Sequence, residues 1–370
     1  MSARFVPYFN YPHVFVSQEE EILSVIKDVG RRGAFIQQKD LKDFEKHLAA
    51  HLGAKHALGV ANGTDALIIA LRAAGIGPGD RVIFASHTYV ATAASIHFVG
   101  ATPVPVECGA DHLIAPSAVE SAITPRTKAI MPTHLNGRTC NMDALQTIAD
   151  KRDLLIVEDA AQGMGSRFKG KAAGTFGIAG TISFYPAKNL GCLGDGGAIL
   201  TNDDRVYEKL RLLRDHGRNP DGEVVMWGYN SRLDNLQAAI LDFKLKHYDQ
   251  EVARRRQVAA IYQARLGDLK ELALPPAPDS DPDHFDVYQN YELLADRRDD
   301  LRAYLKANGI GTLIQWGGKA VHQLSGLGFN VELPYTERLF TRCLMLPMNS
   351  SLSDEDVVYV CERVREFYGH

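Results

Sequence analysis

Short apolar runs alternate with amphipathic stretches along the first two thirds of the chain. Continuous apolar runs occupy 56–60, 81–85 and 154–158, and the segments between them repeat apolar residues at a helical period. Strands buried on both faces have continuous apolar sequences, whereas half-exposed strands alternate between apolar and polar residues. The pattern therefore predicts an α/β fold with a mostly parallel sheet covered by helices on both faces.

The expected elements follow one another in a simple order. They are a helix over 41–52, a strand over 56–60, a helix from the turn ANGTD to about 74, a strand over 81–85, a helix over 88–99, strands over 102–106 and 128–132, a helix over 142–151, strands over 154–158, 180–184 and 197–202, a helix over 204–215, and one long helical stretch over about 233–266. After the proline-rich segment 274–284, the pattern predicts strand, helix, strand, helix and helix. We expect a large domain over 1–245 and a small C-terminal α+β domain over 246–370, with the N-terminal segment packing on the small domain.

Composition excludes several classes of protein. Lys and Arg total 41 against 45 Asp and Glu, so the chain lacks the excess positive charge that binds nucleic acid. It contains no run of 18 apolar residues that would span a membrane, and its first residues form no continuous apolar signal core. The five cysteines are scattered, without a CxxC pair, which favours buried thiols in the reducing cytoplasm.

Polar side chains gather where the predicted strands end. Ligands of open α/β sheets bind at the carboxyl ends of the strands. The groups expected there are Gly63, Thr64 and Asp65 at a helix start, Tyr89 at the next helix start, Asp159 and Gln162 after the strand 154–158, and Ser183 with Lys188 five residues further on. Taken singly, each has an ordinary structural explanation, such as a helix cap, a core aromatic residue or a solvated lysine.

One cofactor, pyridoxal 5′-phosphate, uses all of these groups together. It needs a lysine for the imine with its aldehyde, here Lys188, and an anion beside its pyridine nitrogen, here Asp159. Its phosphate needs N–H groups at a helix start and a hydroxyl such as that of Ser183. Its ring needs an aromatic neighbour, for which Tyr89 is the candidate, and Gln162 can reach its 3-hydroxyl.

The strings ANGTDAL, TYVAT, VEDAAQ, SFYPAKNLGCLGDGG and GYNSRLDNLQAA resemble those of the DegT/DnrJ/EryC1/StrS nucleotide-sugar aminotransferases, over essentially the whole chain. The resemblance implies the fold type I architecture of the aspartate-aminotransferase superfamily. It implies Lys188 as the Schiff-base and proton-shuttling residue, Asp159 on the pyridine nitrogen, Gln162 on the 3-hydroxyl, Tyr89 on the ring, and Thr64 with Ser183 on the phosphate. It also implies that Asn230 reaches the phosphate across a homodimer interface and that Arg232 binds the donor carboxylate.

The same resemblance implies a ping-pong reaction in which L-glutamate gives 2-oxoglutarate and a nucleotide-linked keto-sugar receives the amino group. The strings are more similar to members that aminate the 3-keto than the 4-keto position. Where the family usually has HYPIPLHLQP near the sugar, this chain has QWGGKAVHQ (315–323), which includes His322 as a candidate substrate residue. Because of this departure the sequence does not determine the identity of the sugar, and it does not determine the nucleotide either.

Other functions fit the sequence less well. A nicotinamide dehydrogenase is disfavoured because GCLGDGG precedes a strand, whereas a dinucleotide turn follows one and opens a helix. Related sugar dehydratases resemble this chain but have histidine where Lys188 stands. A non-catalytic cofactor-binding regulator is a further alternative, although no DNA-binding extension is evident. The scattered histidines lack the spacing of metal ligands.

Overall fold

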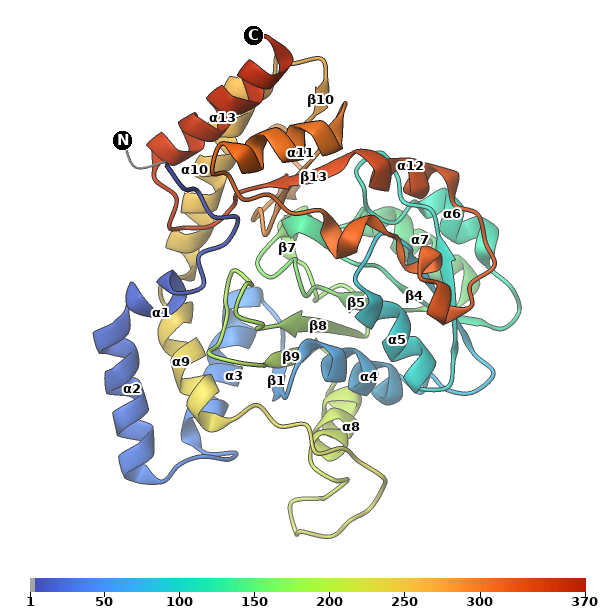
Figure 1. Ribbon diagram of the computed structural model, residues 1–370. Helices are drawn as coiled ribbons and strands as arrows, with labels where there is room; N and C mark the ends of the chain where they lie inside the picture. The colour runs from blue at the N-terminus through green and yellow to red at the C-terminus, as the bar shows by residue number, and fades with distance from the viewer. Residues whose placement is uncertain (1–3) are drawn as a thin grey trace.

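The computed structural model describes residues 4–370, and a seven-stranded sheet forms its centre (Figure 1). The strand order is β1-β9-β8-β5-β4-β2-β3. These strands are β1 (His56–Val60), β2 (Arg81–Ala85), β3 (Thr102–Val106), β4 (Thr127–Met131), β5 (Leu155–Asp159), β8 (Ala179–Ser183) and β9 (Gly197–Thr201). β9 runs antiparallel to both β1 and β8, and the other neighbouring pairs are parallel. The predicted mostly parallel sheet is confirmed.

Helices cover both faces of this sheet. They are α3 (Lys39–Leu52), α4 (Gly63–Ala73), α5 (Val90–Phe98), α6 (Pro116–Ala122), α7 (Met142–Arg152), α8 (Asp204–Arg214) and α9 (Asn235–Leu245), preceded by α1 (His13–Val16) and α2 (Glu19–Arg32). Successive strand residues point to opposite faces. Val82 and Phe84 accordingly join the core under α4, α5 and α8, whereas Ile83 and Ala85 join the core under α6 and α7. This double burial explains the continuous apolar runs.

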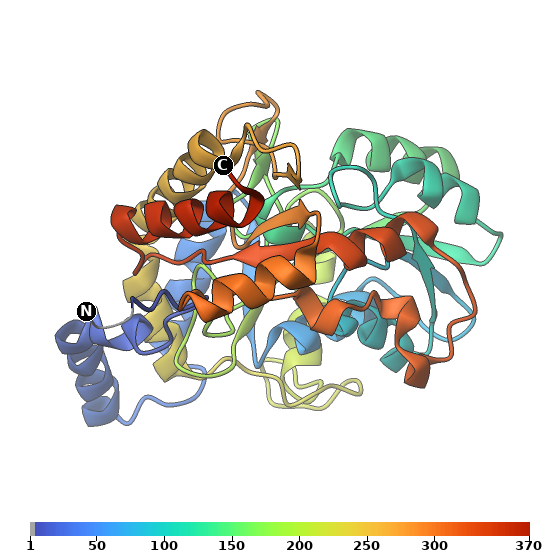
Figure 2. The same cartoon turned by 45° about the horizontal axis from the view of Figure 1, so that its top comes forward.

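Residues 246–370, called the small domain from here on as the rest is called the large domain, contain a second sheet, of order β10-β12-β13. Its elements are α10 (Tyr248–Leu266), β10 (Leu272–Ala273), β12 (Tyr291–Ala295), α11 (Arg298–Ala307), α12 (Pro334–Arg342), β13 (Cys343–Leu346) and α13 (Asp354–Tyr368). A third small sheet joins β11 (His284–Phe285) to β6 (Arg167–Phe168) and β7 (Lys171–Ala172). Val6 pairs with Ile310, so the N-terminal segment lies against the small domain. In Figure 2 the orange and red C-terminal elements cross in front of the large domain.

Two expectations about the elements are wrong. The long helix expected over 233–266 is two helices, α9 and α10, separated at Lys246 and His247. α9 packs on α3 of the large domain and α10 packs on α13 of the small domain, so the helix is interrupted where its packing partner changes. In the small domain α12 precedes β13, whereas the pattern predicted the strand before both final helices.

The remaining short elements are turns of 3-10 helix at Leu135–Gly137, Gln315–Gly318, Val321–Gln323 and Ser325–Leu327. All five cysteines are free and buried. None of the helices in residues 4–370 has the length and apolar character needed to cross a membrane.

Candidate active site

A cavity of about 550 Å³ lies at the carboxyl ends of the central strands. Seven of the predicted site residues line it, namely Gly63, Thr64, Tyr89, Asp159, Gln162, Ser183 and Lys188. They come from segments that follow β1, β2, β5 and β8, which meet at one edge of the sheet. The fold thus brings together groups that are as far as 125 residues apart in the chain.

One end of the cavity offers backbone donors at the start of α4. Within residues 4–370, no acceptor contacts the N–H groups of Gly63 and Thr64. A Cβ at Gly63 would lie 2.9 Å from Ser183 Cβ, so glycine is what allows the helix start to approach that hydroxyl. Free N–H groups at a helix start beside a hydroxyl form a cradle for a phosphate. The donor role predicted for Asp65 does not fit, because its N–H already donates to Asn62 Oδ1 at 2.8 Å.

Asp159 ends β5 with its carboxylate buried and held in place. Thr92 Oγ1 on α5 donates to Asp159 Oδ2 at 2.7 Å, and the N–H of Ala161 donates to Oδ1 at 3.2 Å. The Thr92 hydroxyl also lies 2.8 Å from that of Thr88. Asp159 is 4% exposed, so its charge acts on the cavity with little screening by solvent. This is the environment in which one carboxylate can pair with a protonated ring nitrogen.

Lys188 lies in the loop between β8 and β9, and the close packing of that loop depends on glycines. Its backbone N–H donates to the carbonyl of Tyr185 at 2.8 Å. A Cβ at Gly191 would lie 2.6 Å from the carbonyl oxygen of Pro186, so the loop folds back on itself only with glycine there. Burial lowers the pKa of Lys188 to about 8, although the charge of Asp159 acts in the opposite direction. A larger neutral fraction makes the amine a better nucleophile near neutral pH.

The amide oxygen of Gln162 is hydrogen-bonded within the protein. Its Oε1 accepts hydrogen bonds from the N–H of Asn136 at 2.9 Å and from Asn290 Nδ2 at 3.1 Å. Since Oε1 is occupied and the side chain lines the cavity, Nε2 is the polar atom left to donate there.

Aromatic side chains form the outer wall of the cavity. Tyr89 is 55% exposed at the start of α5, and its ring centre lies 6.5 Å from that of Trp316. Trp316 comes from the small domain, within the string that departs from the family pattern. The small domain therefore closes one side of a cavity that is otherwise built by the large domain.

Three predicted residues lie elsewhere. His322 is buried, with Nδ1 2.7 Å from Ser86 Oγ and Nε2 3.1 Å from Glu337 Oε1, so both ring nitrogens have partners. His322 therefore does not line the cavity, and its expected substrate role stays a prediction. Asn230 is exposed, and Arg232 donates to Asp215 at 3.1 Å; neither lines the cavity of its own chain.

The sequence reasoning did not single out Thr92, Trp316 or Asn136 as site residues. Thr92 could have been found, since it follows Thr88 by four residues in the helix expected over 88–99. Trp316 and Asn136 carry no such signal, because Trp316 lines the cavity and Asn136 contacts Gln162 only through the folding together of distant segments.

These features fit pyridoxal 5′-phosphate. A half-buried lysine, a buried carboxylate and a free helix N-terminus surround one cavity of a mostly parallel sheet. They define a fold type I pyridoxal-phosphate enzyme.

Comparisons with known proteins agree. Residues 16–365 match the model of the DegT/DnrJ/EryC1/StrS aminotransferase family. The chain is 41% identical to a pleiotropic regulatory protein of Geobacillus stearothermophilus over 99% of both chains. It is also 41% identical to dTDP-3-amino-3,4,6-trideoxy-alpha-D-glucose transaminase of Streptomyces venezuelae, over 98% of this chain and 96% of the other. The solved structure of S. venezuelae DesV in complex with a ketimine intermediate has a TM-score of 0.95 at 40% identity, over 99% of both chains.

The chain therefore belongs to the DegT/DnrJ/EryC1/StrS aminotransferase family. It is a pyridoxal-phosphate-dependent aminotransferase, and similar solved chains contain this cofactor or its pyridoxamine form.

Proposed function

We propose that this aminotransferase moves the amino group of L-glutamate to the 3-keto carbon of a nucleotide-linked sugar. The observation that carries the reaction is that Lys188, Asp159 and Gln162 line one cavity. The choice of substrate is supported by the 41% identical relative from S. venezuelae, whose name describes a transaminase of a dTDP-3-amino sugar.

The cofactor supplies an electron sink for the pair of electrons left when a proton leaves the amino donor's α-carbon. Lys188 Nζ, with its lowered pKa, would bind the cofactor's aldehyde carbon with loss of water and, once the amino donor displaces it, would carry the transferred proton. Asp159 keeps a negative charge beside the ring nitrogen, and Thr92 holds that carboxylate in place. Gln162 Nε2 donates to the 3-hydroxyl.

The phosphate is held by the N–H groups of Gly63 and Thr64, with the hydroxyls of Thr64 and Ser183. Asp65 helps to fix the start of α4, because its carboxylate accepts a hydrogen bond from Ser231 Oγ at 2.7 Å. Tyr89 and Trp316 border the side of the cavity that remains for the ring face and the sugar.

We further propose that the enzyme is a homodimer with shared active sites. The loop between α8 and α9 extends away from the body of the chain (Figure 1). It carries Trp227, which is 95% exposed, together with the exposed Val224 and Val225. A cluster of exposed apolar side chains favours burial against a partner. Asn230 stands at the end of this loop, outside its own chain's cavity, so a second copy is the natural recipient of its side chain.

Arg232 fits the same arrangement. Its pairing with Asp215 leaves it outside the cavity of its own chain, so a role at the donor carboxylate requires that it serve the partner's site. The five free thiols are consistent with an enzyme that acts in the cytoplasm.

Incubation with L-glutamate and a panel of keto-sugars tests the reaction. The panel contains 3-keto and 4-keto sugars, each linked to UDP, dTDP or GDP, and release of 2-oxoglutarate is measured. Sustained release with a 3-keto sugar is expected. Turnover confined to 4-keto sugars would show that the enzyme aminates the 4-keto carbon instead. Release of only one equivalent of 2-oxoglutarate with every sugar would mean that the amino acceptor is not a sugar of this class.

A regulatory role is the second candidate, because the 41% identical Geobacillus relative is named a regulatory protein. The two roles separate at the first half-reaction. A catalyst converts L-glutamate to 2-oxoglutarate in single turnover, whereas a purely regulatory cofactor-binding protein leaves glutamate unchanged.

Subunit complementation tests the shared site. Lys188→Ala chains are mixed with chains carrying Asn230→Asp, which places a negative charge where a phosphate is expected. If each site uses Lys188 from one chain and Asn230 from the other, a mixed dimer has one site with both defects and one with neither. Activity then returns from two inactive parents. Absence of recovery, after subunit exchange is verified, would show that each chain completes its own site.

A further inference from the structure

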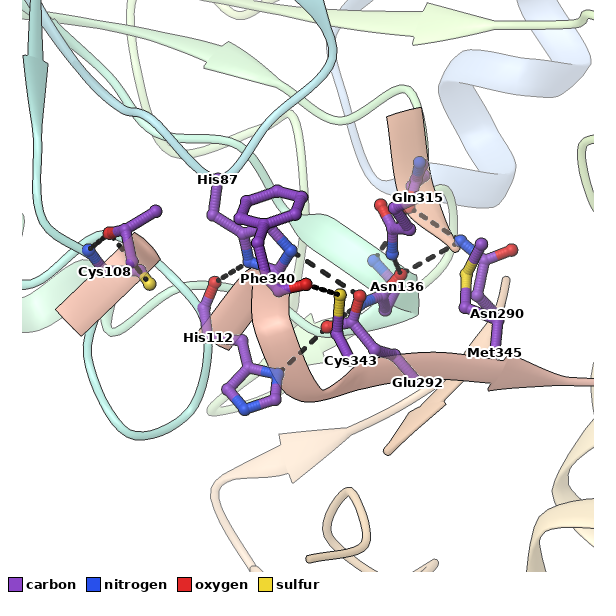
Figure 3. Close-up of polar contacts among 12 residues, drawn as sticks. His87, Cys108, His112, Asn136, Asn290, Glu292, Gln315, Phe340, Cys343 and Met345 are labelled. Carbon is purple, nitrogen blue, oxygen red and sulfur yellow. Dashed lines mark hydrogen bonds and ion pairs between the residues drawn. The ribbon is translucent and has the colours of Figure 1, made fainter. Parts of the chain in front are cut away.

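A continuous hydrogen-bond chain connects a buried carboxylate of the small domain to Gln162 in the cavity. It runs from Glu292 on β12 through Asn136 to Gln162, and Figure 3 shows its part around Glu292, Asn136 and Gln315. The reaction described above assigns no role to Glu292 or Asn136. Both lie behind the cavity wall, away from the reacting groups.

Glu292 is a fully buried anion that is held by two histidines of the large domain. His112 Nδ1 lies 2.9 Å from Glu292 Oε1, and His87 Nε2 lies 3.5 Å from Oε2. Burial alone would raise the pKa of Glu292, but the nearby His87 and His112 lower it. Burial alone would likewise lower the pKa of His87, but the charge of Glu292 raises it. The carboxylate is therefore ionised and can only accept hydrogen bonds.

That restriction fixes the orientation of the Asn136 amide. Asn136 Nδ2 must be the end that faces Glu292 Oε1, at 3.2 Å. Asn136 Oδ1 then faces two donors of the small domain, Asn290 Nδ2 at 2.9 Å and Gln315 Nε2 at 2.6 Å. Four polar side chains thus fit in one pattern of donors and acceptors, and a flipped Asn136 would place an N–H against each of those donors.

The backbone of Asn136 also needs this support. Its φ is 56°, in the left-handed region that residues other than glycine adopt at a cost in free energy. This conformation aims the N–H of Asn136 at Gln162 Oε1, 2.9 Å away. The side-chain bonds of Asn136 therefore hold the backbone donor that orients Gln162.

We propose that Glu292 and Asn136 are positioning residues, which fix the Gln162 amide so that its Nε2 faces the cofactor as a donor. The proposal rests on the proposed function, in which Gln162 donates to the 3-hydroxyl. Glu292, Asn290 and Gln315 belong to the small domain. The orientation of Gln162 therefore also depends on the position of the small domain relative to the large one.

The test uses the holoenzyme and the pH at which the visible absorption band of the bound cofactor changes. A donor on the 3-oxygen stabilises the form in which that oxygen is negative, so its loss moves the transition to higher pH. Gln162→Ala should shift it upward by about one pH unit, as expected for one hydrogen bond to a charged group. Glu292→Gln keeps the shape of the side chain, and Asn136→Gly keeps the left-handed backbone while deleting the amide.

Both positioning variants should shift the transition in the same direction as Gln162→Ala, by a smaller amount. Because they act through one chain, the double variant should shift it no further than Asn136→Gly alone. The matched control is Glu45→Gln, which removes a largely buried carboxylate that pairs with Arg214 but contacts neither Glu292, Asn136 nor Gln162. It should leave the transition at the wild-type pH, which separates positioning from general loss of stability.

The outcomes are distinct. If Gln162→Ala shifts the transition but Asn136→Gly and Glu292→Gln do not, the positioning role is refuted and the proposed function stands. If the transition of Gln162→Ala lies at the wild-type pH, Gln162 does not donate to the 3-hydroxyl. The positioning role is then refuted together with the role that the proposed function gives to Gln162. Should Glu292→Gln fail to fold, Asn136→Gly decides the question alone.

Discussion

Replacing Lys188 by methionine should stabilise the cofactor-free protein near neutral pH. Methionine retains most of the length of the lysine side chain and removes its ammonium group. Burial lowers the pKa of Lys188 from 10.5 to about 8, although Asp159 acts in the opposite direction. At 1.36 kcal/mol for each pKa unit, this difference corresponds to about 3 kcal/mol of unfolding free energy, an upper bound because the side chain is partly exposed.

The sign follows from proton binding. The folded pKa lies below the unfolded value, so between about pH 8 and 10.5 the unfolded chain binds more protons than the folded one. The unfolding free energy of the wild type should therefore rise with pH across this window. The unfolding free energy of Lys188→Met should not rise in this way. The variant should therefore be more stable than the wild type by the full difference at pH 7 and equally stable above about pH 10.5.

Urea denaturation of the cofactor-free proteins at pH 7, 8.5 and 10 measures this difference. The control is Met in place of Lys306, an exposed lysine on α11, which should leave the unfolding free energy within about 0.5 kcal/mol of the wild type. An advantage of Lys188→Met that does not change with pH, or no advantage at pH 7, would refute the argument that burial disfavours the charge of Lys188.

Further variants test other parts of the site. Asp159→Asn preserves the shape of the side chain but removes its charge, and turnover should fall by at least ~10²–10³ with little loss of fold. Gly63→Ala places a Cβ 2.9 Å from Ser183 Cβ and should weaken cofactor binding at least about tenfold in an absorbance titration. Gly30→Ala, where nothing lies within 4 Å, should leave cofactor binding unchanged. Trp227→Ala should weaken dimerisation at least about 30-fold by analytical ultracentrifugation, if this exposed side chain anchors the interface.

Much of the sheet could be predicted because most of its strands are buried on both faces, the edge strand β3 being the exception. Continuous apolar runs then mark the strands directly, and β1 and β2 have the predicted bounds. The division of the expected 233–266 helix into α9 and α10 could not be predicted in this way. No proline or glycine marks Lys246 and His247, and the break reflects packing on two different domains.

The site shows the same contrast between local and distant information. Asp159 ends a strand, Gly63 starts a helix, and Lys188 lies five residues beyond a strand end, so sequence position alone indicates their place. The surroundings of His322 could not be predicted, because its partner Ser86 is 236 residues away and only the folded chain shows that both ring nitrogens are occupied. Glu292 was overlooked for a similar reason, since its role depends on contacts across the two domains.

The central claim is that Lys188 binds the cofactor covalently. The purified holoenzyme should be yellow, and reduction with borohydride should remove the visible band and attach the cofactor permanently. Peptide mapping by mass spectrometry should then find the label in the SFYPAK segment, on Lys188. Lys188→Ala should show no label, even if the phosphate and ring contacts still retain the cofactor. A label on another lysine, such as Lys244 on α9, would contradict the account.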